Sequence, residues 1–237
     1  MAERSGILER FADYFVPIHR DGQKFVAAAI VATLVLFLVW SPLGWLAAIA
    51  TAWVAYIFRD PERVVPMRDG LVVAPADGRV EAVEEVVPDG ELDLGPGRRI
   101  RISIHLSLFD VHINRAPVAG VIARSLYIPG IFGDPLADQA SEDNERRATI
   151  LEMASGDRVG VVQIAGGVRR RIVAFHEQGA RIGVGERIGL IRFGSRVDLY
   201  LPPGFAALVL VGQSMIAGET VVADLKSEEK ERSARLV

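Results

Sequence analysis

The stretch Gly189-Leu190-Ile191-Arg192-Phe193-Gly194-Ser195-Arg196-Val197-Asp198-Leu199-Tyr200-Leu201-Pro202 reads as two short strands that meet at Gly194-Ser195. After the junction, apolar residues alternate with Arg196, Asp198 and Tyr200, which is the period of a half-buried strand. Before it, the apolar residues are types that favour strands. Because glycine adopts backbone angles that other residues resist, the sequence predicts two strands joined by a tight junction.

This junction has two interpretations. Gly and Ser are ordinary turn residues, so a bare Gly-Ser pair favours a plain β-turn. The alternative is chemical, since the Ser195 hydroxyl lies one residue away from the Gly194 carbonyl. Attack within one chain needs no encounter, so a strained peptide bond here could rearrange from amide to ester. The rest of the chain decides between the two.

Composition narrows the class of protein. The chain has 237 residues, which allows one large domain or one medium domain with an accessory segment. Half of the residues are apolar, and the excess is local. The net charge of −3 gives no strong field that points to nucleic acid. The absence of cysteine excludes disulfides and thiolate metal clusters and is compatible with a reducing compartment.

Two apolar runs near the N terminus indicate membrane contact. Phe25–Trp40 and Leu43–Phe58 carry no charge and are separated by Ser41-Pro42. Each run is shorter than the roughly 20 residues that span a bilayer. They could form a helical hairpin that crosses or dips into the membrane, one long kinked span, or a buried hairpin in a soluble core. The last fits worst, because neither run has a polar stripe.

The flanks of these runs favour the hairpin. Aromatic residues lie near the run ends, where the membrane interface favours them. Arg20 and Lys24 precede the runs, and Arg59 and Arg63 follow them. Basic residues on both sides are typical of a hairpin whose two ends are cytoplasmic. We therefore expect the protein to be located at the cytoplasmic face of the cell (inner) membrane.

The remainder predicts a domain rich in short strands. Residues 99–108 alternate most clearly, with isoleucine and leucine on one face and Arg, Ser and His on the other. Further strands are expected at 71–74, 79–87, 120–128, 148–153, 160–164, 170–174, 205–211 and 219–224. The segment 129–147 is long, polar and punctuated by Gly and Pro, which is typical of a functional or mobile loop.

The predicted fold class is α+β. Residues 1–66 would form an amphipathic arm at 7–15, the hydrophobic helical hairpin and a linker rich in proline and charge. Residues 67–237 would form a mainly β domain, sandwich- or barrel-like.

Three residues are candidates for chemistry. Asp77 lies in a Pro-Ala-Asp-Gly turn, His112 follows the clearest strand, and Ser195 follows the central glycine. An Asp, a His and a Ser can act as orienter, base and nucleophile whatever their order in the chain. The structural alternatives are a carboxylate that caps its own turn and a buried, satisfied histidine. His105 and His176 complete no metal-binding spacing, so no metal site is predicted.

An ordered set of motifs resembles the short, membrane-associated, pyruvoyl-dependent phosphatidylserine decarboxylases. The resemblance covers nearly the whole chain. Its motifs are Val16–Arg20, Phe58–Arg63, Ala74–Gly78, Phe109–Pro117, Ser141–Arg146, Phe193–Ser195, Val211–Gln213 and Ala217–Thr220.

The resemblance implies a self-cleaving precursor that acts in phospholipid biosynthesis. Ser195 would attack the Gly194 carbonyl, and the chain would separate into residues 1–194 and 195–237, which remain together as a heterodimer that could assemble further. Residue 195 would become a covalent pyruvoyl group, so no separate cofactor is needed. This group would form a Schiff base with phosphatidylserine and accept the electrons left when carbon dioxide departs. His112 and Asp77 match the other two members of the processing triad.

Two arginines are possible ligands for the substrate's phosphate or carboxylate. Arg115 and Arg146 are the candidates, because a guanidinium matches both anions in shape; a surface ion pair is the alternative for each. Longer bacterial members of this family carry a second histidine where this chain has Arg115. They also have Thr after the Gly-Ser pair, where this chain has Arg196.

Rival functions remain at this point. A phosphoserine ether lipid could replace phosphatidylserine as the substrate. A membrane-anchored β-domain without catalysis would keep its chain whole, and so would a serine hydrolase that uses Ser195, which an acylating inhibitor would trap.

The hairpin makes a prediction about topology. A reporter enzyme fused after residue 66 should be active only on the cytoplasmic side of the membrane, because both basic flanks favour that side. Protease accessibility in spheroplasts measures the side, and a reporter exposed outside the inner membrane contradicts the hairpin.

Overall fold

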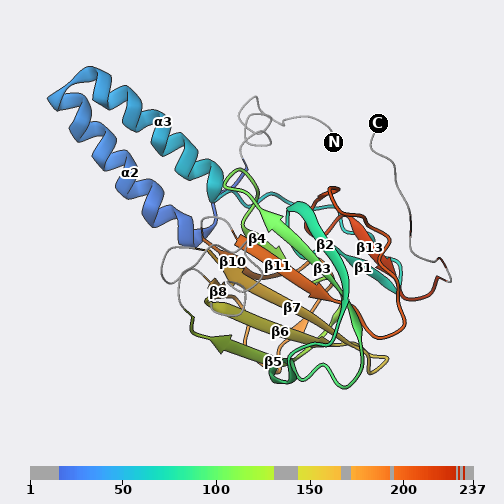
Figure 1. Ribbon diagram of the computed structural model, residues 1–237. Helices are drawn as coiled ribbons and strands as arrows, with labels where there is room; N and C mark the ends of the chain where they lie inside the picture. The colour runs from blue at the N-terminus through green and yellow to red at the C-terminus, as the bar shows by residue number, and fades with distance from the viewer. Residues whose placement is uncertain are drawn as a thin grey trace, which may run out of the picture. The chain divides into compact units, whose positions relative to one another are not determined.

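A computed structural model describes residues 16–130, 144–166, 172–192, 195–227, 229 and 232, and describes Ser195 by its backbone alone. In these ranges two helices precede a succession of β-strands (Figure 1), which confirms the predicted α+β class. The chain divides into two compact units between Glu62 and Arg63. The expected domain boundary at residue 66 stays a prediction.

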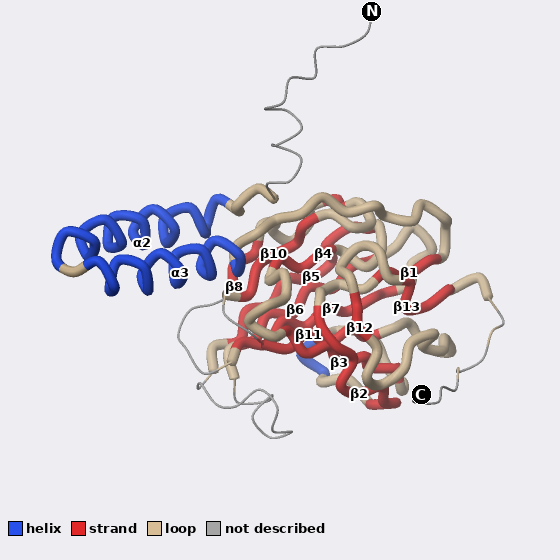
Figure 2. The backbone as a smooth tube through the Cα atoms, turned by 90° about the horizontal axis from the view of Figure 1, so that it is seen from above, coloured by secondary structure: helices blue, strands red, loops and turns tan. Residues whose placement is uncertain are grey.

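The first unit is a helical hairpin. Helix α2 spans Arg20–Val39 and helix α3 spans Ser41–Ile57, so each apolar run forms one helix. Trp40 between them is extended, and a proline in the first turn of α3 suits a helix start. Figures 1 and 2 show the two helices side by side and antiparallel. This excludes the single kinked span among the arrangements considered.

Close contacts fix how the two helices pack. A Cβ on Gly22 would lie 2.3 Å from the Cβ of Phe58, so only glycine fits there. The rings of Phe25 and Phe58 stack with centroids 5.3 Å apart. Halfway along, the hydroxyls of Thr33 and Thr51 share a 2.8 Å hydrogen bond between the helices. These contacts set the register of the hairpin.

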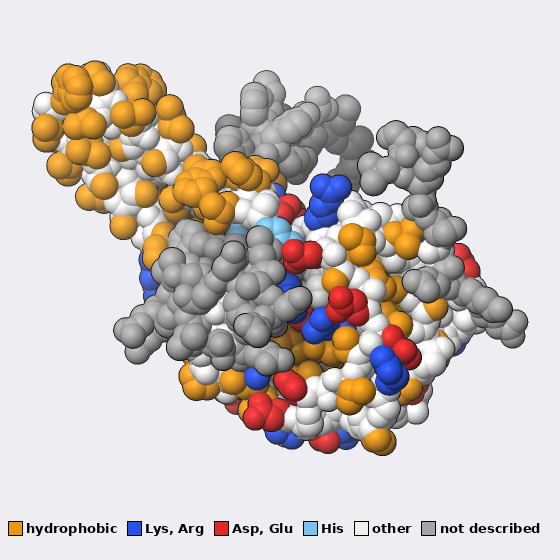
Figure 3. All heavy atoms as spheres, viewed as in Figure 1, with side chains coloured by type: hydrophobic (Ala, Val, Ile, Leu, Met, Phe, Trp, Pro, Cys, Tyr) orange, Lys and Arg blue, Asp and Glu red, His pale blue; other side chains and the backbone are white. Residues whose placement is uncertain are grey.

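The surface of the hairpin is apolar. In Figure 3 hydrophobic side chains cover it, whereas charged side chains are spread over the visible face of the β unit. Large exposed residues of the hairpin include Val31, Leu34, Leu38, Trp45 and Ile49. By length and composition α2 can cross a membrane, and α3 is a shorter apolar helix. A hairpin buried in a soluble core does not fit this exposure, so the hairpin indicates membrane association.

The second unit is built on an antiparallel sheet whose eight described strands run in the order β12-β2-β3-β11-β7-β6-β5-β9. Their bounds are β2 Gly78–Val86, β3 Arg99–Leu106, β5 Gly120–Ile128, β6 Arg146–Glu152, β7 Arg158–Ala165, β9 Arg181–Ile182, β11 Ser195–Tyr200 and β12 Ser214–Met215. A 3₁₀ turn, η1 at Gly90–Leu92, lies between β2 and β3.

Two smaller sheets complete the unit. Strands β4 (Ile113–Arg115), β10 (Arg187–Ile191) and β8 (Ile172–Ala174) form one, and β1 (Leu71–Val73) pairs with β13 (Val221–Asp224) in the other. The two strands predicted around the junction are confirmed as β10 and β11. They belong to different sheets, so the junction is the place where the chain crosses from one sheet to the other.

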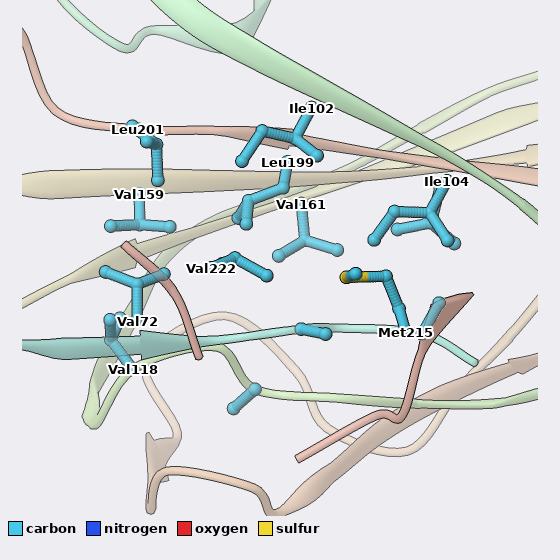
Figure 4. Packing of buried hydrophobic residues seen from close by; sticks show 14 of the residues in the cluster. Val72, Ile102, Ile104, Val118, Val159, Val161, Leu199, Leu201, Met215 and Val222 are labelled. Carbon is cyan, nitrogen blue, oxygen red and sulfur yellow. The ribbon is translucent and has the colours of Figure 1, made fainter. Parts of the chain in front are cut away.

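The main core lies between the large sheet and the smaller ones. Ile102, Ile104 and Leu199 of the large sheet face Val72 and Val222 of the small pair (Figure 4). A second cluster on the other face of the large sheet includes Leu92, Ile150, Val162, Ile164 and Tyr200. Strand β7 is therefore apolar on both faces, as expected of a strand covered on both sides.

Three predicted details are wrong. The segment 205–211 is not a strand, although Ala207, Leu208 and Val209 are buried. Its backbone amides make isolated hydrogen bonds, for example from the Leu208 amide to the Val222 carbonyl at 2.8 Å. The apolar residues of this segment therefore fill the core without pairing as a β-strand. The strand at 99 ends at Leu106 rather than 108, because Ser107 donates to Asp110 and starts a turn. The predicted arm at 7–15 and most of the loop 129–147 lie outside the described residues. The end of that predicted loop is wrong, because Arg146 and Arg147 already pair within β6.

Candidate active site

The predicted nucleophile lies at one end of the large sheet. Ser195 is the first residue of β11 and pairs with Leu106 at the end of β3 and Ala165 at the end of β7. Asp77 directly precedes β2, which is the other neighbour of β3. The backbones of Asp77 and Ser195 therefore lie at the same end of the sheet, with one strand between them.

The segment that carries His112 connects these two regions. His112 is buried, and its carbonyl accepts a hydrogen bond from the Ile191 amide at 3.1 Å. Three residues later, the Arg115 amide donates to the Pro75 carbonyl at 2.8 Å. Backbone hydrogen bonds thus join the three segments that contain Asp77, His112 and the approach to Ser195. Gly194 lies outside the described residues, and the catalytic roles of the three residues stay predictions.

Asp77 is a buried carboxylate with both oxygens engaged. Its Oδ2 accepts from Arg63 Nη2 at 2.7 Å, and its Oδ1 accepts from the Ala217 amide at 2.7 Å. Burial raises the pKa of Asp77 above its ordinary value, although the Ala217 amide and the Arg63 charge pull the pKa down and Asp110 pushes it up. The alternative that Asp77 caps its own turn is therefore not supported, because its two partners, Arg63 and Ala217, are distant in sequence.

A buried amide pair joins the small sheet to the large one. Gln163 of β7 donates from Nε2 to Oδ1 of Asn114 in β4 at 2.7 Å, and both side chains are fully enclosed. Asn114 Nδ2 and Gln163 Oε1 have no further partner in the part of the chain that the structure describes. Gln163 pairs with Val197, two residues from Ser195. Sequence reasoning did not single out this pair, although a glutamine within the apolar β7 sequence was a usable signal.

A buried ion pair follows Ser195 directly. Arg196 donates from Nε and Nη2 to the two oxygens of Asp198, each at 2.8 Å. Both side chains are almost fully enclosed. Breaking a buried pair is costly, because one charge is left without compensation. Because both partners belong to β11, each buried charge is compensated within the strand itself.

The two arginines predicted to bind substrate occupy different environments. Arg115 is buried, and its Nη1 donates to the Gly185 carbonyl at 2.9 Å. Arg146 begins β6, lies 3.5 Å from Asp89, and lines a small polar cavity with Arg101 and Tyr200. Neither environment is a fully exposed surface ion pair. Their contact with substrate stays a prediction.

His105 pairs with Arg196 of β11 at this same end of the large sheet, whereas His176 lies outside this arrangement. His176 Nε2 is 3.1 Å from the Arg187 carbonyl and 3.5 Å from Glu186. Among the described residues, no group of three or more His, Asp or Glu side chains is arranged to hold a metal ion.

Comparison with known proteins gives the family. The family model for phosphatidylserine decarboxylase matches residues 50–223. The phosphatidylserine decarboxylase proenzyme of Cereibacter sphaeroides is 49% identical over 226 residues, which cover 95% of this chain and 97% of that relative. This chain belongs to the phosphatidylserine decarboxylase family. The family predicted from the motifs is confirmed, and with it the expectation of an enzyme.

The family match covers every part of the site described above. Residues 50–223 include the turn at Asp77, the segment around His112, the crossover into β11 and the loop at Ala217. The match extends over most of the β unit, and the site residues within it stay predictions.

Gly78 is predicted to be essential to this arrangement. Its φ is +142°, and a Cβ there would lie 2.1 Å from the His105 carbonyl oxygen. We expect Gly78→Ala to lower the free energy of unfolding by about 3 kcal/mol, since strain and a backbone clash combine. Gly97→Ala is the matched control, because its φ of +105° is also positive but the space around it is open.

For this control we expect a loss of about 1 kcal/mol. Urea titration of the full-length chains in detergent, followed by far-ultraviolet circular dichroism, measures both values. Equal losses for the two variants would contradict the close approach at Gly78.

Proposed function

We propose that this chain is a self-processing, pyruvoyl-dependent decarboxylase that converts phosphatidylserine to phosphatidylethanolamine. One structural observation carries the proposal: the segments of Asp77 and His112 are hydrogen-bonded to each other and to the strand that enters the Gly194-Ser195 crossover. The Cereibacter sphaeroides relative is a proenzyme, which supports a precursor that matures.

Maturation begins with an acyl shift at the crossover. The Ser195 hydroxyl oxygen bonds to the Gly194 carbonyl carbon, the amide C–N bond breaks, and the Ser195 nitrogen becomes an amine. The resulting ester then loses the α-proton of residue 195, and its Cβ–O bond breaks. This releases residues 1–194 with a terminal carboxylate. Water replaces the nitrogen of the dehydroalanine left at 195, ammonia departs, and a ketone remains.

His112 and Asp77 supply the acid–base chemistry of the first step. His112 takes the proton of the Ser195 hydroxyl, which makes the oxygen nucleophilic. Asp77 orients the imidazole and stabilises its positive charge, as a buried carboxylate does in a triad. Their segments are held by the backbone hydrogen bonds of Arg115 and Ile191, which supports a preset geometry.

The surroundings of residue 195 suit a covalent group at that position. Strands β3 and β7 pair with β11 on both sides of residue 195, so the backbone that would carry such a group is paired along both edges. The enclosed amide of Gln163, which is opposite Val197, and that of Asn114 in the small sheet offer polar atoms in the nearby core. When present, a pyruvoyl group supplies the electron-withdrawing carbonyl that stabilises the carbanion left by loss of carbon dioxide.

The two pieces of the cut chain stay together as a heterodimer. Strand β11 of residues 195–237 pairs with β3 on one side and β7 on the other. In addition β12 pairs with β2, and β13 with β1. The Leu199 and Val222 side chains of the same piece are buried in the main core. Removing the small piece would leave two strand edges unpaired and open the core.

The hairpin holds the enzyme at the cytoplasmic face of the inner membrane. Its apolar surface and its basic flanks support this location, and the substrate is a membrane lipid. Arg115 and Arg146 are proposed ligands of the headgroup, since guanidinium groups suit both a phosphate and a carboxylate.

The nucleophile is tested by one substitution. Ser195→Ala should leave the 25.8 kDa chain uncut, because alanine has no hydroxyl to attack Gly194. Ser214→Ala, which changes an exposed serine of the same piece, should cut like the parent. A denaturing gel and the intact mass of the small fragment provide the measurement, and a carbonyl reagent should label that fragment. Cleavage of the Ser195→Ala chain at the same place would contradict the assignment of Ser195 as the nucleophile.

The heterodimer makes a separate prediction. With an affinity tag on the N terminus, the small piece should co-purify in detergent with the large one at a ratio of one to one. Only denaturant should separate them, because the small piece supplies a central strand. Loss of the small piece on simple washing would contradict this arrangement.

A further inference from the structure

The loop at 216–220 brings the linker before β1 to the side of Asp77. The Gly218 amide donates to the Ala74 carbonyl and the Ala74 amide donates to the Thr220 carbonyl, both at 2.8 Å. On its other side the same loop receives the linker, since the Val64 amide donates to Glu219 at 3.0 Å. These bonds place Arg63 next to Asp77 although 14 residues separate them.

The Arg63–Asp77 pair is enclosed and directional. Its side chains are only 12% and 13% exposed, and Nη2 of Arg63 lies 2.7 Å from Oδ2 of Asp77. Arg63 Nε is buried and has no other partner in the described ranges. An ion pair screened from water in this way is stronger than one at the surface, and the loss of one partner is costly. The Arg63 guanidinium is therefore directed at the Asp77 carboxylate.

We propose that Arg63 is a positioning residue that, with the Ala217 amide, keeps the Asp77 carboxylate charged and fixed for self-cleavage. This inference rests on the proposed function, in which Asp77 stabilises the His112 imidazolium. A protonated Asp77 would lose that capacity, and a carboxylate held by one oxygen alone could rotate. Arg63 and the Ala217 amide hold one oxygen each.

The charges around Asp77 determine how the rate of self-cleavage should depend on pH. Burial raises the pKa of Asp77, Asp110 adds to the rise, and Arg63 opposes it. Removing Arg63 therefore raises the pKa of Asp77 further. Cleavage needs the ionised form, so the acid limb of the cleavage rate should move to higher pH. The other titratable or charged groups on the packed segments are His112, Arg115 and Glu219, which the variant leaves in place.

The first test follows cutting of freshly translated full-length chains on denaturing gels between pH 5 and 9. On the acid limb Arg63→Gln should cut about tenfold more slowly at a given pH, since a rise of one unit in the pKa of Asp77 lowers its ionised fraction there tenfold. Arg63→Lys should fall between, because it keeps a charge without the planar fork. The matched control is Arg68→Gln, which removes an exposed 2.5 Å pair with Asp224 from the same linker and should cut like the parent.

Two outcomes of this test overturn the proposal. One is cutting of Arg63→Gln at the parental rate with the parental pH profile. The other is a loss of rate by the same factor at every pH, which indicates only a structural role. If Arg63→Gln does not fold, the decision passes to Arg63→Lys, which must show the displaced acid limb.

The second test does not require cutting. In uncut Ser195→Ala chains labelled with ¹³C at the aspartate carboxyl, the Asp77 signal is assigned by its loss in Asp77→Asn. Adding Arg63→Gln should raise the pKa of that signal, and Arg68→Gln should leave it unchanged. An unchanged pKa overturns the electrostatic role of Arg63. If the parent chain never cuts, the proposed function fails, and this titration still decides the contact of Arg63 with Asp77.

Discussion

The structure depends on the pairing of β11 along both of its edges. Strand β11 lies between β3 and β7 in the large sheet, whereas the preceding strand β10 belongs to the small sheet with β4. The few residues between them must therefore leave one sheet and enter another. An interior strand satisfies its backbone groups on both sides, so its first residue has little freedom to move. The same pairing sets the place of the crossover and fixes the piece that follows it.

Three enclosed polar pairs lie near this end of the large sheet. Asp77 with Arg63, Asn114 with Gln163, and Arg196 with Asp198 are each enclosed and bonded. Such groups are expensive to bury and are poor sources of stability compared with apolar residues of the same size. Other polar residues, such as Arg99 and Thr149, are buried elsewhere, and these three pairs are the ones that lie near the start of β11, where acid–base chemistry is proposed.

Local patterns predicted much of this arrangement, and long-range contacts explain the rest. Local pattern identified β3 and β11 from their alternation and the two hairpin helices from their uncharged apolar runs, because period and run length are visible in consecutive residues. It failed at 205–211, where apolar side chains fill the core without a partner strand. The family motifs drew attention to Asp77, His112 and Ser195. The roles of Arg63 and Gln163 were not visible, since their partners lie 14 and 49 residues away in the sequence.

The central place of β11 also bears on the order of events in the life of the chain. Residues 195–200 lie between the strands of residues 99–106 and 158–165, which are joined in the large sheet through β11 itself. Under the proposed function, a nascent polypeptide that has not assembled this sheet lacks the arrangement that severs it. The scission then works as an internal inspection: only a correctly folded molecule acquires its reactive carbonyl, and defective copies stay inert.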